Sequence, residues 1–474
     1  AYSGLATTDD FEYIGSSEGD TINLNINRAT THTGDFTINT GDGNDSILSA
    51  KLKNADSINL GAGNDSISVM VSGTYGTPSL AAMDMTLLDG GSGTDTISFE
   101  ESTVASGTTL NLTTGGATNF ENLTGSASIE TLNGDANANT ITGNGGADTI
   151  YGKGGNDILY GHSSNSQNAA SSQSGDDNLY GGSGDDNLYG TAGENILDGG
   201  TGKDTMAGGN GADTFIIRAG DGSSTLTSAD VITDFQDGTD VIGMASLAFD
   251  DLTIAQGSGN YSSHVLVSKT SSSEYLAIIH DTLVGNINAL DFTSTSTDAQ
   301  TLSGTTGNDT LIGGAGVDTA NGGAGSDSVY GWAGNDIINI TGKSGAFIDT
   351  INGGAGTDTM NINYSGITSL TDFTISMSGA ITTLTDSSNG VVNYQSIENL
   401  TVNNLVYTSV SSASINSGDG GISNAYWGAS EKLLIATKSS IWYAQNINSA
   451  YSGLATTDDF EYIGSSEGDT INLN

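Results

Sequence analysis

Residues 304–339 consist of four consecutive nine-residue units, GTTGNDTLI, GGAGVDTAN, GGAGSDSVY and GWAGNDIIN. Every unit has Gly at its first and fourth positions, Asp at its sixth and an apolar residue at its eighth. Glycine allows the backbone angles of a tight turn, and the residues after the Asp alternate as in a short strand. One turn plus strand buries too little to be stable alone, so the pattern predicts units that stack into a coil.

The same nine-residue step recurs elsewhere in the chain. It runs through about 132–217, interrupted by a polar insert at 162–173, and weaker copies lie between about 15 and 100 and at 353–361. A flexible linker rich in Gly and Asp would have no reason to keep Ile or Leu in phase with the Asp. We therefore interpret these regions as β-rolls with degenerate turns beside them.

The charge of the chain indicates which partners it can have. It contains 55 acidic and 10 basic residues, a net charge of -45, and only 35% hydrophobic residues. A chain of this composition stays disordered unless something neutralises it. Nucleic acid is excluded as a partner because almost no Lys or Arg is present to contact phosphates. Metal cations fit the composition better.

The sixth-position Asp brings a hard oxygen ligand to each turn. Calcium takes six to eight such oxygens from carboxylates and carbonyls, whereas magnesium requires a tighter octahedron, and the turns predict on the order of ten bound Ca²⁺ ions. The candidate calcium ligands are Asp20, Asp45, Asp65, Asp95, Asp148, Asp157, Asp177, Asp186, Asp204, Asp213, Asp309, Asp318, Asp327, Asp336 and Asp358.

The chain has no cysteines, so neither a disulfide nor a thiolate metal site is expected. It has no apolar run of about 18 residues and no basic segment followed by an apolar one. We therefore expect no membrane span and no signal peptide of the usual kind.

The repeated units resemble the GGxGxDxUx nonapeptide of the RTX proteins. This resemblance implies an all-β fold of parallel β-rolls with calcium in their turns, an extracellular or cell-surface location, and type I secretion. Two copies depart from the pattern and leave their ligand open. GTAGENILD has Glu194 and Asn195 where an x-Asp pair is usual, and NGDANANTI has Asn139 in place of Asp.

The stretch at 230–242 contains the pattern DxIxDFxxGxDxI. It resembles the segment that caps the rolls of serralysin-type secreted proteases with antiparallel strands, which would cover the exposed strand edges of a roll. In those families the cap lies near the C-terminus beside the secretion signal. Here a second roll follows it, so the cap is internal and the secretion signal cannot be placed on this segment.

The predicted organisation has six segments. They are degenerate turns with a β module at 1–130, a first β-roll at 131–217, a β-rich cap at 218–300, a second β-roll at 301–364, a β module at 365–449 and a copy of the opening text at 450–474. TNFENLTG at 118–125 and YQSIENLTV at 394–402 end stretches of alternating residues, which predict β modules packed beside the rolls. Lys432, Lys438, Trp442 and Tyr443 fit either a contact surface or an ordinary β core.

The sequence does not support the active sites of secreted hydrolases. None of the 4 histidines stands in HExxH, so the zinc-protease motif is missing. A GxSxG match at 15–19 lies in a calcium-type turn with no helix predicted after it, unlike a nucleophile elbow. In carboxylate pairs such as Asp176 and Asp177, the second residue is the predicted ligand and the first is expected in solvent. We expect no enzyme.

The first 25 residues, AYSGLATTDDFEYIGSSEGDTINLN, recur letter for letter at 450–474, a spacing of 450 − 1 = 449 residues. The simplest explanation is one period of a tandem array followed by the start of the next. Alternatively, the duplicated segment could be donated as a strand across a junction between units. A cloning artefact would also duplicate the text.

We therefore expect a calcium-dependent structural repeat unit of an extracellular bacterial filament or giant surface protein, joined head to tail to copies of itself. Millimolar calcium outside the cell would order the rolls, and scarce calcium inside would leave the chain unfolded for export. Two alternatives stay open. One is an adhesin whose 365–449 module binds a cell-surface glycan or lipopolysaccharide, and the other is a surface-layer lattice protein.

Overall fold

The computed structural model describes residues 10–24, 34–50, 52, 55–70, 85–100, 104–112, 116–162, 175–378 and 380–410. Farther along the chain it describes the strands β38 (Ile422–Gly428), β39 (Lys432–Thr437), β40 (Ile441–Tyr443), β41 (Asp459–Ile463) and β42 (Thr470–Asn472). The chain forms two compact units, Ala1–Gly243 with Leu252–Asp291 and Met244–Asp251 with Phe292–Asn474.

The regular elements of the described residues are strands and short 3-10 helices, so the expected all-β fold is confirmed. The 3-10 helices are η2 (Met85–Leu87), η3 (Leu226–Ser228), η4 (Phe249–Asp251), η5 (Gly259–Tyr261), η6 (Val284–Asn286), η7 (Ala289–Asp291) and η8 (Leu370–Asp372). No helix in this part of the chain is long and apolar enough to cross a membrane.

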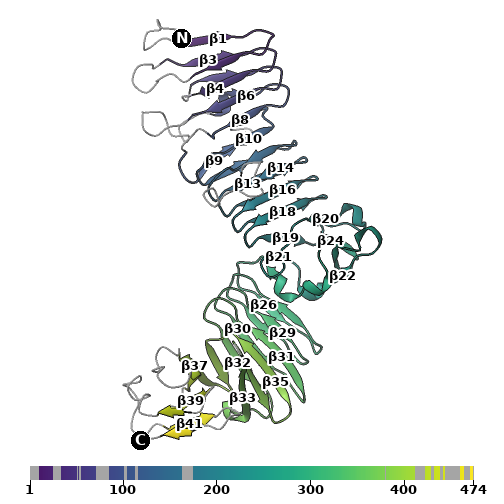
Figure 1. Cartoon of the computed structure of the whole chain (residues 1–474), viewed down its shortest axis with the longest axis vertical. Coiled ribbons are helices and arrows are strands. Elements are labelled where there is room, and N and C mark those ends of the chain that lie inside the picture. Colours follow the sequence, from purple (N-terminus) through teal and green to yellow (C-terminus); the bar gives the residue numbers. More distant parts are fainter. Residues whose placement is uncertain are drawn as a thin grey trace. The chain divides into compact units, whose positions relative to one another are not determined.

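Successive strands of the first unit alternate between two walls of a coil, and Figure 1 shows them stacked as rungs. Neighbours within a wall pair in parallel, and where the nonapeptide step is unbroken they are 18 residues apart, as for Asn187 and Thr205 (205 − 187 = 18). One wall contains β2 (Thr21–Asn23), β4 (Ser46–Ala50), β6 (Ser66–Val69), β8 (Thr96–Ser98), β10 (Asn122–Thr124), β12 (Thr140–Thr142), β14 (Ile158–Tyr160), β16 (Asn187–Ala192), β18 (Thr205–Asn210) and β20 (Asp230–Ile232).

The opposite wall of the first unit is made of two sheets, which also pair in parallel. The first contains β1 (Phe11–Ile14), β3 (Phe36–Asn39), β5 (Ser57–Asn59) and β7 (Leu88–Asp89). The second contains β9 (Thr108–Asn111), β11 (Glu130–Asn133), β13 (Thr149–Gly154), β15 (Asn178–Ser183), β17 (Ile196–Thr201), β19 (Thr214–Arg218) and β21 (Val241–Ala245). Strands β1 and β2 each stand at the end of their sheet.

The core of this unit lies between its walls. Ile141, Leu159 and Leu188 pair in register in one wall and are fully buried. Ile150 and Leu179 do the same in the other wall. Because alternate side chains of a strand point to opposite faces, the eighth position of each nonapeptide supplies the core. Burying one such side chain stabilises the fold by about 1.5–3 kcal/mol.

The segment that resembles a protease cap extends the wall that ends at β20. Strands β22 (Leu252–Gln256), β23 (Val265–Lys269) and β24 (Glu274–Ile279) form antiparallel pairs, and β24 pairs in parallel with β20. The edge of β20 that faces away from β18 is therefore hydrogen-bonded instead of open.

The second unit repeats the coil. Its strands are β25 (Phe292–Ser294), β26 (Thr301–Ser303), β27 (Thr310–Ile312), β28 (Thr319–Asn321), β29 (Ser328–Tyr330), β30 (Ile337–Thr341), β31 (Phe347–Asn352), β32 (Thr359–Asn363), β33 (Phe373–Ser378), β34 (Ile381–Asp386), β35 (Gly390–Gln395), β36 (Asn399–Val402), β37 (Leu405–Val410) and the strands β38 to β42 given above. One wall has the order β26-β28-β30-β32-β36 and the other the order β27-β29-β31-β35, continued by the antiparallel pair β34-β33. Val329, Ile338 and Met360 belong to its core.

The residues at 118–125 and 394–402 lie in the rolls, not in modules beside them. Strand β10 pairs in parallel with both β8 and β12, and β36 pairs in parallel with β32. The ENLT sequence that both segments share has an apolar Leu two residues after its Glu, as a nonapeptide has two residues after its Asp. It therefore forms a rung of the same kind.

Candidate metal-binding turns

The predicted calcium ligands occupy equivalent places at the turns that precede the strands. All of them are buried except Asp20 and Asp309, which are half-buried. The neighbouring fifth position is exposed at most of these turns, as for Asp176 beside Asp177. Its side chain is nevertheless bonded, because Oδ1 of Asp176 accepts a 2.8 Å hydrogen bond from the backbone N–H of Glu194.

One oxygen of each buried carboxylate is held by the backbone of an adjacent rung. The N–H of Asp157 donates to Oδ1 of Asp186 at 2.6 Å, and the N–H of Asp186 donates to Oδ1 of Asp204 at 2.8 Å. In the second unit the N–H of Asp336 donates to Oδ1 of Asp358 at 2.8 Å. We call these repeated bonds, from the N–H of one turn residue to the side-chain oxygen of the next in the same wall, the carboxylate ladder.

The second oxygen has no protein partner at most of these turns. Buried Oδ2 atoms without a hydrogen-bond partner belong to Asp45, Asp65, Asp95, Asp148, Asp157, Asp186, Asp204, Asp213, Asp336, Asp349 and Asp358. A buried charged oxygen without a partner is strongly destabilising unless a cation neutralises it. Three of the weaker copies before residue 100, those of Asp45, Asp65 and Asp95, share this feature, so their degenerate sequence has not changed the turn chemistry.

The electrostatics of these turns favour a bound cation. Burial raises the pKa of Asp148 to about 8 and those of Asp157 and Asp204 to about 7. Neighbouring carboxylates add to the rise, while the ladder hydrogen bonds oppose it. A bound cation would stabilise the ionised forms instead.

The first glycine of each unit leaves room beside the free oxygen. A Cβ on Gly143 would lie 2.5 Å from Oδ2 of Asp148 and 2.5 Å from the carbonyl oxygen of Gly161. A carboxylate oxygen and a carbonyl oxygen from an adjacent rung thus face the same space, which a methyl group would fill. These are the ligands that calcium prefers. The residues therefore fit a calcium ion. The φ of the first Gly is not positive, so this position requires glycine for its missing side chain and not for its backbone angle.

Among the described residues, no three or more His, Cys, Asp or Glu side chains come together as a metal-binding group. The oxygens at these turns come from single carboxylates and from the backbone.

Several turn residues extend the ladder although they lie outside the nonapeptide pattern. Glu121 Oε2 accepts from the N–H of Asp95, and Glu398 Oε2 accepts from that of Asp358. Further acidic residues that do so are Glu130, Asp230, Asp240 and Asp349. Each stands two residues before a buried apolar side chain, and this acid-x-apolar signal would have found them without the glycines.

Two of the predicted ligands contact a basic side chain at Oδ2. His162 Nδ1 lies 3.0 Å from Oδ2 of Asp177. Because the backbone N–H of Gly175 donates to His162 Nε2, the ring proton is on Nδ1 and is donated to Asp177. Lys343 Nζ lies 2.6 Å from Oδ2 of Asp327.

Three further predicted ligands have an Oδ2 bonded within their own turn. Asp20, Asp309 and Asp318 accept there from the N–H groups of Ser16, Thr305 and Gly314.

At Asn195 an amide group replaces the carboxylate. Its Nδ2 donates to the carbonyl oxygens of Gly193 and Gly208 and to Oδ1 of Asp213. A donor therefore points where other turns present an acceptor, which disfavours a cation there.

The GxSxG match at 15–19 lies between β1 and β2. The N–H of Ser16 donates to Oδ2 of Asp20 at 2.9 Å, as at other turns. The match is thus part of a roll turn.

The sequence-family model of the RTX calcium-binding nonapeptide repeat matches this chain at residues 124–162, 172–206, 180–215, 189–226, 296–327, 303–338 and 343–361. These segments are RTX repeats. RTX repeats bind calcium, and RTX repeat proteins are typically secreted. The buried Oδ2 atoms from Asp148 to Asp358 therefore belong to matched calcium-binding repeats, whereas those of Asp45, Asp65 and Asp95 lie before the first matched segment.

No curated protein sequence is similar to this chain. Among solved structures, the extracellular lipase LipA from Serratia marcescens is similar, with 11% identity over 76% of this chain and 65% of that chain and a TM-score of 0.13. This chain therefore spans less than two thirds of that protein's length. A TM-score this low carries no argument about fold or activity.

Proposed function

We propose that this chain is a calcium-dependent structural repeat unit of an extracellular filament or giant surface protein, joined head to tail to further copies. The observation that carries the proposal is the pairing of the duplicated text, whose two copies pair with different strands. In the first copy, β1 pairs in parallel with β3, which aligns Phe11 with Phe36, and β2 pairs with β4, which aligns Ile22 with Ile47.

The second copy pairs with the strands that precede it in the sequence. Strand β41 pairs in parallel with β39, which aligns Phe460 with Leu433, and β42 pairs in parallel with β40, which aligns Ile471 with Trp442. Phe460 and Ile471 are the same positions of the text as Phe11 and Ile22 (460 − 11 = 449 and 471 − 22 = 449).

If both sets of pairings form at one junction between units, the duplicated text has a neighbouring strand on each side. A strand flanked by β39 on one edge and β3 on the other has both rows of backbone groups hydrogen-bonded, which removes an exposed edge. Successive units would then continue the parallel pairing from one into the next. A solenoid that extends in this way suits a spacer, since each rung contacts only its neighbours.

Calcium would order such a unit after export. With on the order of ten ions, roughly half of the net charge of -45 would be neutralised. Where calcium is scarce, the buried Oδ2 atoms oppose folding, which keeps a chain exportable.

Electron microscopy of the native material, with calcium and after chelation, tests this function. Filaments with an axial repeat of one 449-residue period, lost or loosened by chelation, would support it. Separate particles in both conditions would overturn it, and two-dimensional arrays would favour a surface-layer lattice instead.

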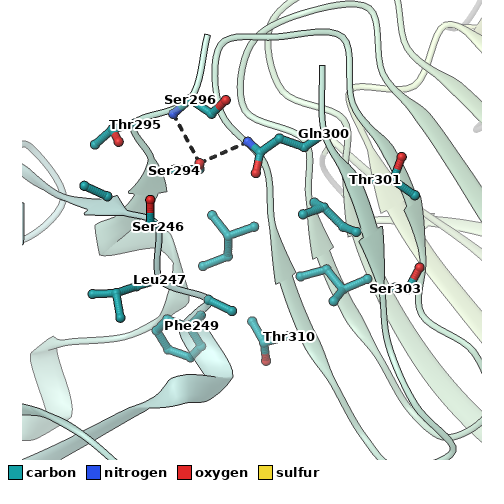
Figure 2. A pocket seen from close by; sticks show the side chains of 15 residues that line it. Ser246, Leu247, Phe249, Ser294, Thr295, Ser296, Gln300, Thr301, Ser303 and Thr310 are labelled. Atoms are coloured by element: carbon teal, nitrogen blue, oxygen red, sulfur yellow. Dashed lines mark hydrogen bonds between the residues drawn. The ribbon is translucent and has the colours of Figure 1, made fainter. Parts of the chain in front are cut away.

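A ligand-binding adhesin is the second candidate, and one cavity favours it. The cavity lies in the second unit, measures about 610 Å³ and is lined by 245–249, 294–296, 300–303 and 310–312. Figure 2 shows the hydroxyls of Ser246 and Ser294, the Gln300 amide and the Phe249 ring around it. Neutral polar groups next to an aromatic ring suit a carbohydrate. The cavity lies outside the 365–449 module that the sequence suggested.

A glycan array probed with the calcium-loaded chain tests the second candidate. Binding that is lost in a Gln300→Ala variant would support an adhesin. Equal glycan binding by the chain without substitution and by Gln300→Ala would argue against this cavity as a binding site.

A further inference from the structure

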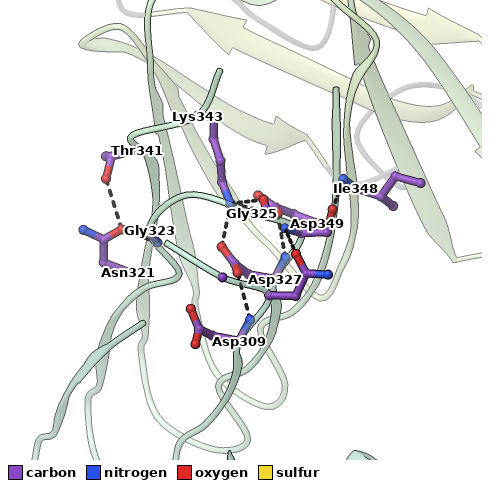
Figure 3. Close-up of polar contacts among 12 residues, drawn as sticks. Asp309, Asn321, Gly323, Gly325, Asp327, Thr341, Lys343, Ile348 and Asp349 are labelled. Atoms are coloured by element: carbon purple, nitrogen blue, oxygen red, sulfur yellow. Dashed lines mark hydrogen bonds and ion pairs between the residues drawn. The ribbon is translucent and has the colours of Figure 1, made fainter. Parts of the chain in front are cut away.

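Lys343 is buried in the second roll with its ammonium group among turn oxygens, as Figure 3 shows. Its Nζ lies 2.6 Å from Oδ2 of Asp327, 2.9 Å from Oδ1 of Asp349 and 3.1 Å from the carbonyl oxygen of Gly325. The three side chains are each 1% exposed or less. A lysine ammonium has three donors and no acceptor, so all three of its N–H groups are satisfied.

The oxygens around Lys343 are of the kinds found at the other turns. Asp336, one nonapeptide after Asp327, donates its N–H to Oδ1 of Asp358 at 2.8 Å, as Asp327 does to Oδ1 of Asp349 at 2.9 Å. The Oδ2 of Asp336 is buried without a partner, whereas that of Asp327 is bound to Lys343. The difference between the two turns is that a lysine ammonium contacts Oδ2 only at the Asp327 turn.

The lysine reaches this position from an irregular turn. The step between ladder residues Asp336 and Asp349 is 13 residues (349 − 336 = 13) instead of 9, and Lys343 lies in the extra length. Its Nζ also lies 5.1 Å from the centroid of the Phe347 ring, a position that favours a cation.

We propose that the Lys343 ammonium takes the place of a calcium ion at the Asp327 turn, so that this rung of the second roll is held without metal. A calcium ion cannot share the space, because two cations so close would repel each other and the lysine already uses the oxygens. Removing the lysine side-chain charge would then expose a calcium site made by Asp327, Asp349 and Gly325. This inference rests on the proposal that calcium fills the remaining turns.

Calcium per chain, measured by metal analysis after equilibrium dialysis, tests the inference on the full chain. We expect Lys343→Met to bind one more ion than the unchanged protein. The matched control is Lys203→Met, because Lys203 is an exposed fifth-position residue of an RTX turn and its loss removes the same charge without opening a site. An unchanged or lower ion count in folded Lys343→Met would overturn the inference.

A second pair of variants keeps the test decisive if Lys343→Met does not fold. Asp336→Asn is expected to lower the number of bound ions, whereas Asp327→Asn leaves it unchanged, because Asp327 binds an ammonium. Equal losses in the two variants would overturn the inference. If the chain without any substitution binds no calcium, that result would instead contradict the proposed function.

Discussion

The backbone N–H of Asp157 donates a 2.6 Å hydrogen bond to Oδ1 of Asp186, while Oδ2 of Asp186 is buried without a partner. The bond fixes the carboxylate to the adjacent rung and leaves its second oxygen for a cation. The fold therefore buries negative charge that a bound metal ion would neutralise.

Removal of calcium should destabilise the rolls. We expect excess chelator to lower the melting temperature and the β-type circular dichroism of the chain, because the free Oδ2 atoms lose their neutralising charge. Restored calcium should reverse both changes. A chain that keeps its spectrum and melting temperature in chelator would contradict the calcium mechanism.

In metal-free buffer, stability should fall as the pH rises. The pKa of Asp148 is raised to about 8 and that of Asp157 to about 7, while an unfolded Asp has a pKa of about 3.9. The folded state thus binds more protons, and its extra stability is complete below about pH 4 and lost as the pH rises through 7 and 8. Melting temperatures across this range, without calcium, check the sign. With saturating calcium we expect the trend to weaken, because the ion holds the carboxylates ionised.

A methyl group beside one free oxygen should disturb one ion. In Gly143→Ala the new Cβ would lie 2.5 Å from Oδ2 of Asp148 and 2.5 Å from the Gly161 carbonyl oxygen. We expect a loss of about 1–3 kcal/mol in the free energy of unfolding and weaker calcium binding, measured by chemical unfolding and calcium titration. Gly285→Ala is the control, because nothing lies within 4 Å of its Cβ position.

Truncation of a core side chain should destabilise the first roll. Leu188 is fully buried, so Leu188→Ala should cost about 2–5 kcal/mol in chemical unfolding at saturating calcium. Ile129 is 47% exposed, and Ile129→Ala should change the stability by less than about 0.5 kcal/mol. Similar effects of the two substitutions would argue against the assignment of the core.

Deletion of 450–474 should open an edge for other copies. Strands β39 and β40 would lose β41 and β42, and we expect them to accept β1 and β2 of another chain, giving concentration-dependent assembly in sedimentation velocity. A peptide of the 25-residue text in excess should suppress the assembly. A deleted chain that is folded but monomeric at all concentrations would argue against the head-to-tail junction.

The nonapeptide register was sufficient to predict the local structure. Gly at the fourth position, as in Gly155, has a positive φ, and the eighth-position apolar residues, as in Leu159, form the core. Both follow from interactions within one unit or between identical units, so the sequence alone carries them. The burial of the sixth-position aspartates follows from the same repetition.

The sequence determined the repeated turn and strand, the inward apolar residues and the need for cations. Only the tertiary structure decided which carboxylate oxygens stay free, that ENLT sequences are rungs, and that Lys343 reaches Asp327 across an irregular turn. It also decided that the two copies of the duplicated text pair with different strands. The physical reason is that stacking brings together residues from separate turns. Wherever an insert changes the step, the sequence no longer tells which residues meet.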